Sequence, residues 1–256
     1  MKHNYGVTKN HLIKVEVAAF SATSAINAEA AGADRIELCS GYSEGGLSPS
    51  IGSIIHVMEN VAIPVHVMCR PRAGDFIYNK HEIEVIRKEI KFYKELNVHG
   101  IVLGVLNTDG AIDHILLNEL VNLARPMKVT FHRAFDLVND LRYNLELLID
   151  CGVDFLLTSG QKNNAYLGKK NIRELVERAG DRIRIMAGGG INKESVGKLV
   201  EFTGVSEIHL SGKTLFKSPM EKINLEFQIN TDEALGDFSW YECAPDKIRA
   251  VKDIFS

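Results

Sequence analysis

The chain has 256 residues, of which 45% are hydrophobic and 25% charged, and its formal net charge is −3 at pH 7. This balance is typical of a globular protein that buries a core without disulfides, and it argues against a dominant nucleic-acid-binding surface. No apolar run approaches the roughly 18 residues that span a bilayer, and the N-terminus shows no secretory signal. The four cysteines include no CxxC pair. We therefore expect free thiols and a cytoplasmic protein with no membrane anchor.

One unit recurs along the chain: a short strand rich in β-branched residues, a polar loop and a helical stretch. This alternation predicts βαβ units and a parallel sheet. Eight repeats in a chain of this length favour a closed barrel, and no G-x-G-x-x-G motif follows the first strand to support an open dinucleotide-binding sheet. We predict an α/β fold, one (β/α)8 TIM barrel that forms a single domain over residues 1–256. Its strands are expected near residues 15–20, 35–40, 64–70, 100–106, 128–133, 154–160, 182–190 and 206–212.

The first two strands already place polar side chains inside the predicted barrel. Alternate residues of a barrel strand face the interior, and the outer set must be apolar because it packs on the helices. This phase turns Glu16 inward on the first strand, and Glu37 and Cys39 inward on the second. The glycine-rich loop that follows offers Ser43 and Glu44 as ligand-binding candidates.

The third strand and its loop contain two arginines. His66, Met68 and Arg70 face inward by the same phase, and Arg72 and Asp75 follow in the loop. Two arginines at the carboxyl end of a strand could grip a carboxylate or phosphate bidentately. The alternative is that Asp75 simply neutralises one of them.

The fifth and sixth strands add further candidates. Thr130 and His132 face inward on the fifth strand, and the segment TFHRAFD places Asp136 four residues after the histidine. A histidine with an orienting carboxylate can act as a general base or a metal ligand, although a lone histidine is more often structural. On the sixth strand, Thr158 is expected to face inward.

The seventh and eighth strands end in a pattern that resembles a phosphate-binding cradle. Gly188, Gly189 and Gly190 close the seventh strand, and His209 and Ser211 belong to the eighth. Backbone N–H groups of such loops bind anions in many barrels. The alternative is that the glycines only allow a sharp turn. Beyond these strands, residues 213–240 fit a loop or extended chain, and residues 245–255 fit the eighth helix.

Together these side chains make the predicted interior unusually polar for a barrel, since Val, Ile and Leu normally fill that space. Buried ionisable groups must pair with one another, as Glu37 could with Arg70, or with water or a ligand. The whole set favours a site at the carboxyl ends of the strands. Glu37, His132 and Asp136 are the candidates for catalysis there.

Six strings, in this order from about residue 14 to residue 212, resemble the CutC copper-homeostasis family: GADRIELC, EGGLSPS, RPRAGDF, VTFHRAFD, LTSGQ and MAGGGI. The resemblance implies a cytoplasmic (β/α)8 barrel, usually a homo-oligomer, that binds copper ions, and it implies no settled reaction. Its proposed ligands are two cysteines near the ends of strands one and two. The second corresponds to Cys39, whereas Ala18 stands at the position of the first. Because Cu(I) prefers sulfur ligands, this departure weakens a tight Cu(I) site. Side chains that could supplement the single thiol are Met68, Met186, His66 and His132.

Three functions remain open from the sequence. The first is copper homeostasis, with Cu(I) bound through Cys39. The second is an enzyme that acts on a small anionic or phosphorylated metabolite by isomerisation, aldol cleavage or hydrolysis. The third is a nuclease that recruits Glu16, Glu37 and Asp75 as metal ligands, and it ranks last because the net charge gives it no support.

Overall fold

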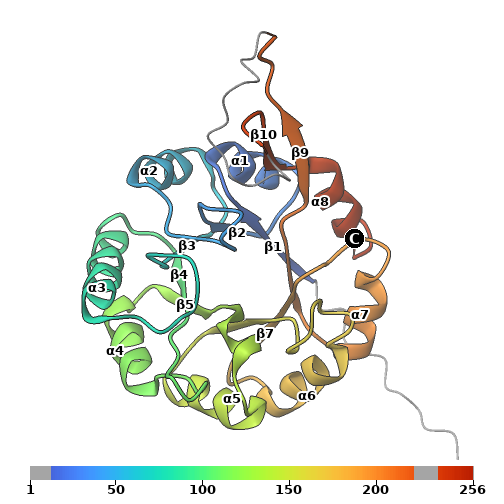
Figure 1. The fold of residues 1–256 in the computed structure, drawn as a ribbon. Coiled ribbons are helices and arrows are strands. Elements are labelled where there is room, and N and C mark those ends of the chain that lie inside the picture. The colour runs from blue at the N-terminus through green and yellow to red at the C-terminus, as the bar shows by residue number, and fades with distance from the viewer. Residues whose placement is uncertain (1–12, 222–235, 256) are drawn as a thin grey trace, which may run out of the picture.

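Eight parallel strands close into a barrel in the computed structural model, which describes residues 13–221 and 236–255 (Figure 1). The strands follow chain order around the barrel, and β8 pairs with β1 to close it. Each lies at a predicted position, so the (β/α)8 fold is confirmed. The strands are β1 (Lys14–Ala19), β2 (Arg35–Leu38), β3 (Val65–Met68), β4 (Gly100–Leu103), β5 (Lys128–Phe131), β6 (Phe155–Thr158), β7 (Arg184–Gly188) and β8 (Glu207–Leu210).

Helices surround the strands (Figure 1). They are α1 (Ala22–Ala30), α2 (Ile51–Asn60), α3 (Lys80–Glu95), α4 (His114–Ala124), α5 (Leu141–Asp150), α6 (Lys169–Ala179), α7 (Val196–Thr203) and α8 (Pro245–Lys252), with a 3-10 helix η1 (Arg133–Leu137) after β5. Helix α3 illustrates how the local sequence starts a helix and buries one of its faces. Asn79 and Glu82 form a capping box at its start, and Ile86 and Ile90 are buried on its inner face. Within the described ranges, no helix has the length and apolarity that crossing a membrane requires.

The barrel interior is shaped by glycines as well as by polar side chains. A Cβ at Gly100 of β4 would lie 2.6 Å from the His66 ring, and a Cβ at Gly104 would overlap the ring of His132. Real Cβ atoms do not approach this closely, so glycine at these two positions makes room for two inward-facing imidazoles.

The phase predicted for β6 is wrong. Phe155 contacts the inward-facing Arg35, whose guanidinium lies 4.4 Å from the ring centroid, and Leu157 lines the cavity at the barrel mouth. Thr158 therefore faces outward and donates a hydrogen bond to Asp136 at 2.5 Å. The strand sequence FLLT is apolar on both faces, so alternation alone could not distinguish inside from outside.

A two-stranded hairpin extends from the barrel beyond α1 (Figure 1). It pairs β9 (Lys213–Lys217) with β10 (Ser239–Cys243) in antiparallel register. The interval 213–240 was expected to be loop or extended chain. Its described ends are strands, whereas residues 222–235 lie outside the described residues. The eighth helix is confirmed as α8.

Candidate functional site

A cavity of about 1080 Å³ opens at the carboxyl ends of the strands, where barrel enzymes place their chemistry. Among the residues proposed from the sequence, those that line it are Glu37, Ser43, Arg70, His132, Gly189, Gly190, His209 and Ser211. Those that do not line it are Glu16, Cys39, Glu44, Arg72, Asp75, Thr130, Asp136, Thr158 and Gly188.

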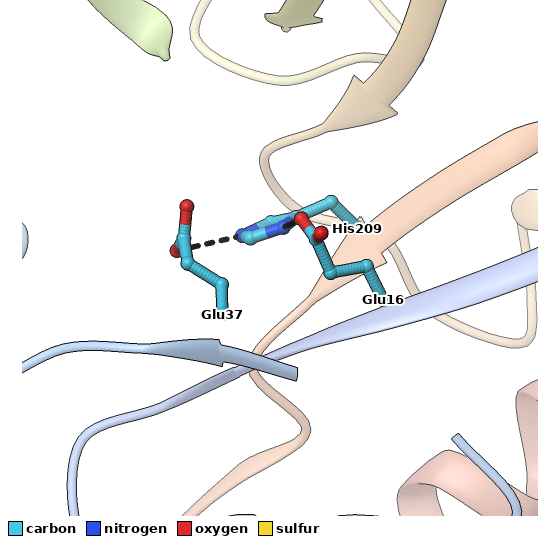
Figure 2. Close-up of side chains that lie close together, drawn as sticks. All are labelled: Glu16, Glu37 and His209. Atoms are coloured by element: carbon cyan, nitrogen blue, oxygen red, sulfur yellow. Dashed lines mark hydrogen bonds and ion pairs between the residues drawn. The ribbon is translucent and has the colours of Figure 1, made fainter. Parts of the chain in front are cut away.

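Three titratable side chains from neighbouring strands meet at the floor of this cavity. In Figure 2 the imidazole of His209 lies between the carboxylates of Glu16 and Glu37. Its Nδ1 is 2.8 Å from Oε1 of Glu16, and its Nε2 is 3.6 Å from Oε2 of Glu37. All three side chains are buried, and one ligand atom from each lies within 4.8 Å of the others. These residues are therefore the best placed to hold a metal ion among those described.

Arg35 and Glu207 lie below these residues, and sequence reasoning missed both. The Arg35 guanidinium forms a short ion pair with Glu16 and a second, of 2.7 Å, with Glu207. Both residues follow the inward phase of Glu37 and His209, two positions earlier on the same strands. That phase was the available signal, and extending it one step towards the amino ends of β2 and β8 would have found them.

Burial and these ion pairs act in opposite directions on the three titratable groups. Burial raises the pKa of Glu16, but Arg35 and His209 outweigh it and hold that pKa well below its usual range. Burial also raises the pKa of Glu37, and the opposing effect of His209 does not cancel the rise. For His209, burial lowers the pKa, whereas the two carboxylates together raise it above the ordinary value.

The two terminal nitrogens of the Arg70 guanidinium are engaged by backbone carbonyls. Its Nη1 donates to the carbonyls of Glu44 and Gly46 at 2.7 and 3.0 Å, and its Nη2 donates to the carbonyl of Gly74 at 2.8 Å. Arg70 therefore fastens the β2–α2 loop to the β3–α3 loop and is not free to grip an anion bidentately. Nor does it form the expected ion pair with Glu37 among the described contacts.

Arg72 and Asp75 lie outside the cavity. Arg72 forms ion pairs of 2.9 Å with Asp75 and 2.6 Å with Glu82 at the start of α3. The alternative left open by the sequence, neutralisation by Asp75, is therefore the one observed, and the predicted two-arginine grip is wrong.

His132 faces the cavity as a neutral donor. Its Nδ1 accepts a hydrogen bond from the backbone N–H of Ala134 at 3.1 Å, so Nδ1 carries no proton. Burial first, and then the charge of Arg70, lower the pKa of His132 to about 3. A neutral ring with Nδ1 unprotonated must carry its proton on Nε2, and this atom is buried with no hydrogen-bond partner in the part of the chain that the structure describes.

Asp136 does not orient His132 as predicted. It accepts hydrogen bonds from Thr158 and from the backbone N–H groups of Ser159 and Gln161, and it forms an ion pair of 2.8 Å with Arg133. These contacts hold the loop after β6. Asp136 was assigned to His132 because the two are close in sequence, but η1 turns the carboxylate towards β6.

Three buried polar atoms at the cavity have no hydrogen-bond partner among the described residues: Oε1 of Glu37, Nε of Arg70 and Nε2 of His132. Only a few buried polar groups in native proteins are unsatisfied, and each requires an explanation. Two of these atoms are donors and one is an acceptor. Their position at one cavity indicates that it receives a polar ligand.

The β7–β8 side of the cavity presents lysines among backbone turns, and Glu194 and Asp246 also belong to the lining. Gly189, Gly190 and Ser211 line it together with Lys193 and Lys213. Neither lysine forms an ion pair within residues 13–221 and 236–255.

Lys213 was not among the predicted site residues. It donates a short hydrogen bond to the Tyr42 hydroxyl, and its Nζ lies 4.5 and 4.6 Å from the ring centroids of Tyr42 and Tyr241. These contacts join the β2–α2 loop to the C-terminal hairpin. Because they bring together residues 42, 213 and 241, no local sequence pattern could predict them.

The single thiol near the cavity is Cys39. It packs against Met68 and Val102, and its Sγ lies 3.5 Å from Oε2 of Glu37. Burial and then the Glu37 charge raise the pKa of Cys39 well above its ordinary value, so the group is a protonated thiol. Ala18 lines the cavity and offers no second sulfur.

Known proteins resemble this chain along nearly all of the barrel. A sequence model described as the CutC family matches residues 13–214. The Copper homeostasis protein cutC homolog of Homo sapiens is 42% identical over 240 residues, which cover 94% of this chain and 88% of the human protein. A family protein CutC of Parabacteroides distasonis is 41% identical, covering 92% of this chain and 98% of that protein. A solved CutC structure from Streptococcus agalactiae superposes with a TM-score of 0.73 at 32% identity, covering 78% of this chain and 98% of that one. The chain therefore belongs to the CutC family.

Proposed function

We propose that this chain is a barrel enzyme that binds a small anionic metabolite at the carboxyl ends of its strands. The observation that carries the proposal is the group of unpartnered atoms of Glu37, Arg70 and His132 at one cavity. A ligand that accepts two hydrogen bonds and donates one would satisfy all three, and leaving them buried and unsatisfied costs about 1–3 kcal/mol each.

The donors suit a substrate oxygen. The Nε2–H of His132 is a neutral donor, and the Nε–H of Arg70 is a charged one. Donors that are fixed before substrate arrives stabilise negative charge that develops on a carbonyl oxygen, because they need no reorganisation. Polarising a carbonyl in this way stabilises the enolate that forms when isomerisation transfers an adjacent proton to a base such as Glu37, or when aldol cleavage breaks an adjacent C–C bond.

The β7–β8 side of the cavity, where Lys213 lies, would bind the anionic end of the substrate; we call this the anion anchor. Lys213 is held between Tyr42 and Tyr241, and the backbone of Gly189 and Gly190 lies at the same wall. An ammonium group beside exposed backbone N–H groups suits a phosphate or carboxylate. We therefore assign the anionic end of the substrate to Lys213 and the reacting oxygen to His132.

Isothermal titration calorimetry with inorganic phosphate and phosphoglycolate tests the anchor. We expect Lys213→Met to weaken the binding of both anions about 10- to 100-fold. This change is equivalent to the loss of a charge-assisted hydrogen bond of roughly 1.5–3 kcal/mol. Lys217→Met, at the far end of the same strand, is the matched control and should bind like the wild type. If the wild type binds neither anion at millimolar concentration, or if the two variants behave alike, the anchor is wrong.

Proton exchange tests the donors. Phosphorylated aldehydes and ketones are incubated with the protein in D2O, and proton NMR follows the loss of carbon-bound protons. We expect the wild type to exchange a proton next to the carbonyl of at least one compound, and His132→Asn to lose that exchange. Equal exchange by both proteins, or none by the wild type across this compound class, contradicts the proposed polarisation.

Copper homeostasis is the second candidate, because relatives in Homo sapiens and Mus musculus carry that name and because Cys39 and Met68 pack together beside the cavity. A thiol and a thioether are soft donors of the kind that Cu(I) prefers. With Ala18 in place of a second thiol, we propose weak, reversible Cu(I) binding, with copper as cargo. The free cysteines of the described chain fit a reducing cytoplasm.

Competition with a chromogenic Cu(I) chelator tests the copper proposal on the reduced protein. We expect Cys39→Ser to lose one equivalent of Cu(I), whereas Cys151→Ser, which removes the thiol at the C-cap of α5, outside the cavity lining, keeps it. Equal binding by the wild type and both variants removes Cys39 from copper handling.

A further inference from the structure

We infer that Glu37 and His209 bind a divalent transition-metal ion at the floor of the cavity, with Glu16 orienting the imidazole. This inference goes beyond the proposed function, since it concerns neither Cu(I) nor the anion anchor. The remaining coordination positions of the ion would face the cavity, because both Glu37 and His209 line it.

The first argument is a distance. Nε2 of His209 and Oε2 of Glu37 are 3.6 Å apart, which is too long for a hydrogen bond. Two ligands on one metal ion, each bonded at about 2.1 Å, are separated by roughly 3.4–3.6 Å when the angle at the metal is about 110–120°. The observed gap therefore has the width that a shared metal ion requires.

The second argument is the environment of Glu37. Its side chain is 5% exposed, and Oε1 has no partner among the described residues. Arg35, the buried cation nearest in the cluster, is already engaged by Glu16 and Glu207. The charge partner nearest to Glu37 is His209, which is shared with Glu16, so a bound cation would supply neutralisation that this buried carboxylate otherwise has only in part.

The third argument is the orientation of His209. Oε1 of Glu16 lies 2.8 Å from Nδ1, and Arg35 forms an ion pair with the other oxygen of the same carboxylate, so Nδ1 donates to Glu16. A metal ion bound here would take the place of the proton on Nε2, the atom that faces Glu37, while Nδ1 stays with Glu16 (Figure 2). Histidines that bind a metal ion through one nitrogen usually donate the N–H of the other nitrogen to a carboxylate or carbonyl, which fixes the orientation of the ring.

The donor set limits which ion is bound. One imidazole nitrogen and carboxylate oxygens suit Zn²⁺ or Mn²⁺, whereas Cu(I) prefers sulfur. Along the first transition series, affinity for such ligands rises from Mn²⁺ to Cu²⁺ and then falls at Zn²⁺, which still binds more tightly than Mn²⁺. We therefore expect Zn²⁺ and Mn²⁺ to compete for one site, and Zn²⁺ to bind more tightly.

Titration of the chelator-treated full chain with Zn²⁺ and with Mn²⁺, by calorimetry and by the shift in thermal unfolding, tests the inference. We expect one equivalent of either ion to bind and to raise the unfolding temperature. Glu37→Gln should abolish both effects, and Glu16→Gln should weaken binding about 10- to 100-fold, as is typical when the carboxylate that orients a metal-binding histidine is lost. Circular dichroism confirms that each variant is folded.

The matched control is Glu194→Gln, which removes a carboxylate from the rim of the same cavity. It should bind Zn²⁺ like the wild type. Absence of Zn²⁺ binding by the wild type, or equal binding by Glu37→Gln and Glu194→Gln, overturns the inference. Neither result bears on anion binding at Lys213, so failure here is distinguishable from failure of the proposed function.

Discussion

Acidification should destabilise this protein through His132. The ring is 5% exposed, and its pKa is lowered from 6.5 to about 3 by burial and by Arg70. Between these values the unfolded chain binds a proton that the folded chain does not, so stability falls as the pH falls. A pH of 5 lies about 1.5 units below 6.5, the pKa of His132 in the unfolded chain. Protonation of the unfolded chain therefore lowers the free energy of unfolding by roughly 2 kcal/mol, at 1.36 kcal/mol per unit.

The assay is urea denaturation of the wild type and His132→Asn at pH 7 and pH 5. Asparagine can still accept the N–H of Ala134 through its side-chain oxygen, so the substitution removes the titrating ring while keeping the cap. We expect the stability advantage of the wild type over the variant to shrink by about 2 kcal/mol between the two pH values. Because the comparison is made between proteins, contributions from other titrating groups cancel. An advantage that is constant or that grows towards pH 5 refutes a neutral, buried His132.

Three further outcomes follow from the packing. Gly104→Ala should cost about 1–3 kcal/mol of unfolding free energy in urea, because the added methyl group overlaps the ring of His132; no loss of stability would mean that the ring moves freely. Arg35→Met should cost about 3–5 kcal/mol in the same assay, because it leaves Glu16 buried without its cation, and a stability equal to that of the wild type would contradict the assigned ion pair. Self-association, expected from the family, is tested by light scattering. We expect the wild type to be an oligomer, and Trp240→Glu, on the exposed face of the hairpin, to convert it to a monomer. A variant that keeps the wild-type mass shows that this face is not the interface.

The strand positions and most of the inward faces were predictable, because polar and apolar residues alternate clearly in those strands. Glu37 and His209 are flanked by apolar neighbours, so their phase follows from the need to pack the outer face on helices. Where that contrast is absent, as in the β6 sequence FLLT, the phase of Thr158 could not be read. Alternation is therefore informative only on strands whose two faces differ.

The partners of the site residues were harder to predict than their positions. Arg70 is satisfied by backbone carbonyls of two loops, and every residue has a carbonyl, so residue type gave no signal. Asp136 is four residues from His132, yet the short helix η1 directs it to Ser159. Tyr42 meets Lys213 only because the first residue of β9 lies beside the β2–α2 loop. Such contacts depend on loop geometry, which hydrophobic periodicity does not encode.

The most direct measurement is a crystal structure of the chain grown with phosphoglycolate. We predict the ligand in the cavity at the carboxyl ends of the strands, with its phosphate beside Lys213 and a carboxylate oxygen accepting hydrogen bonds from Nε2 of His132 and Nε of Arg70. An empty cavity, or a structure in which protein atoms satisfy those two nitrogens, would contradict the proposal that this cavity is the substrate site.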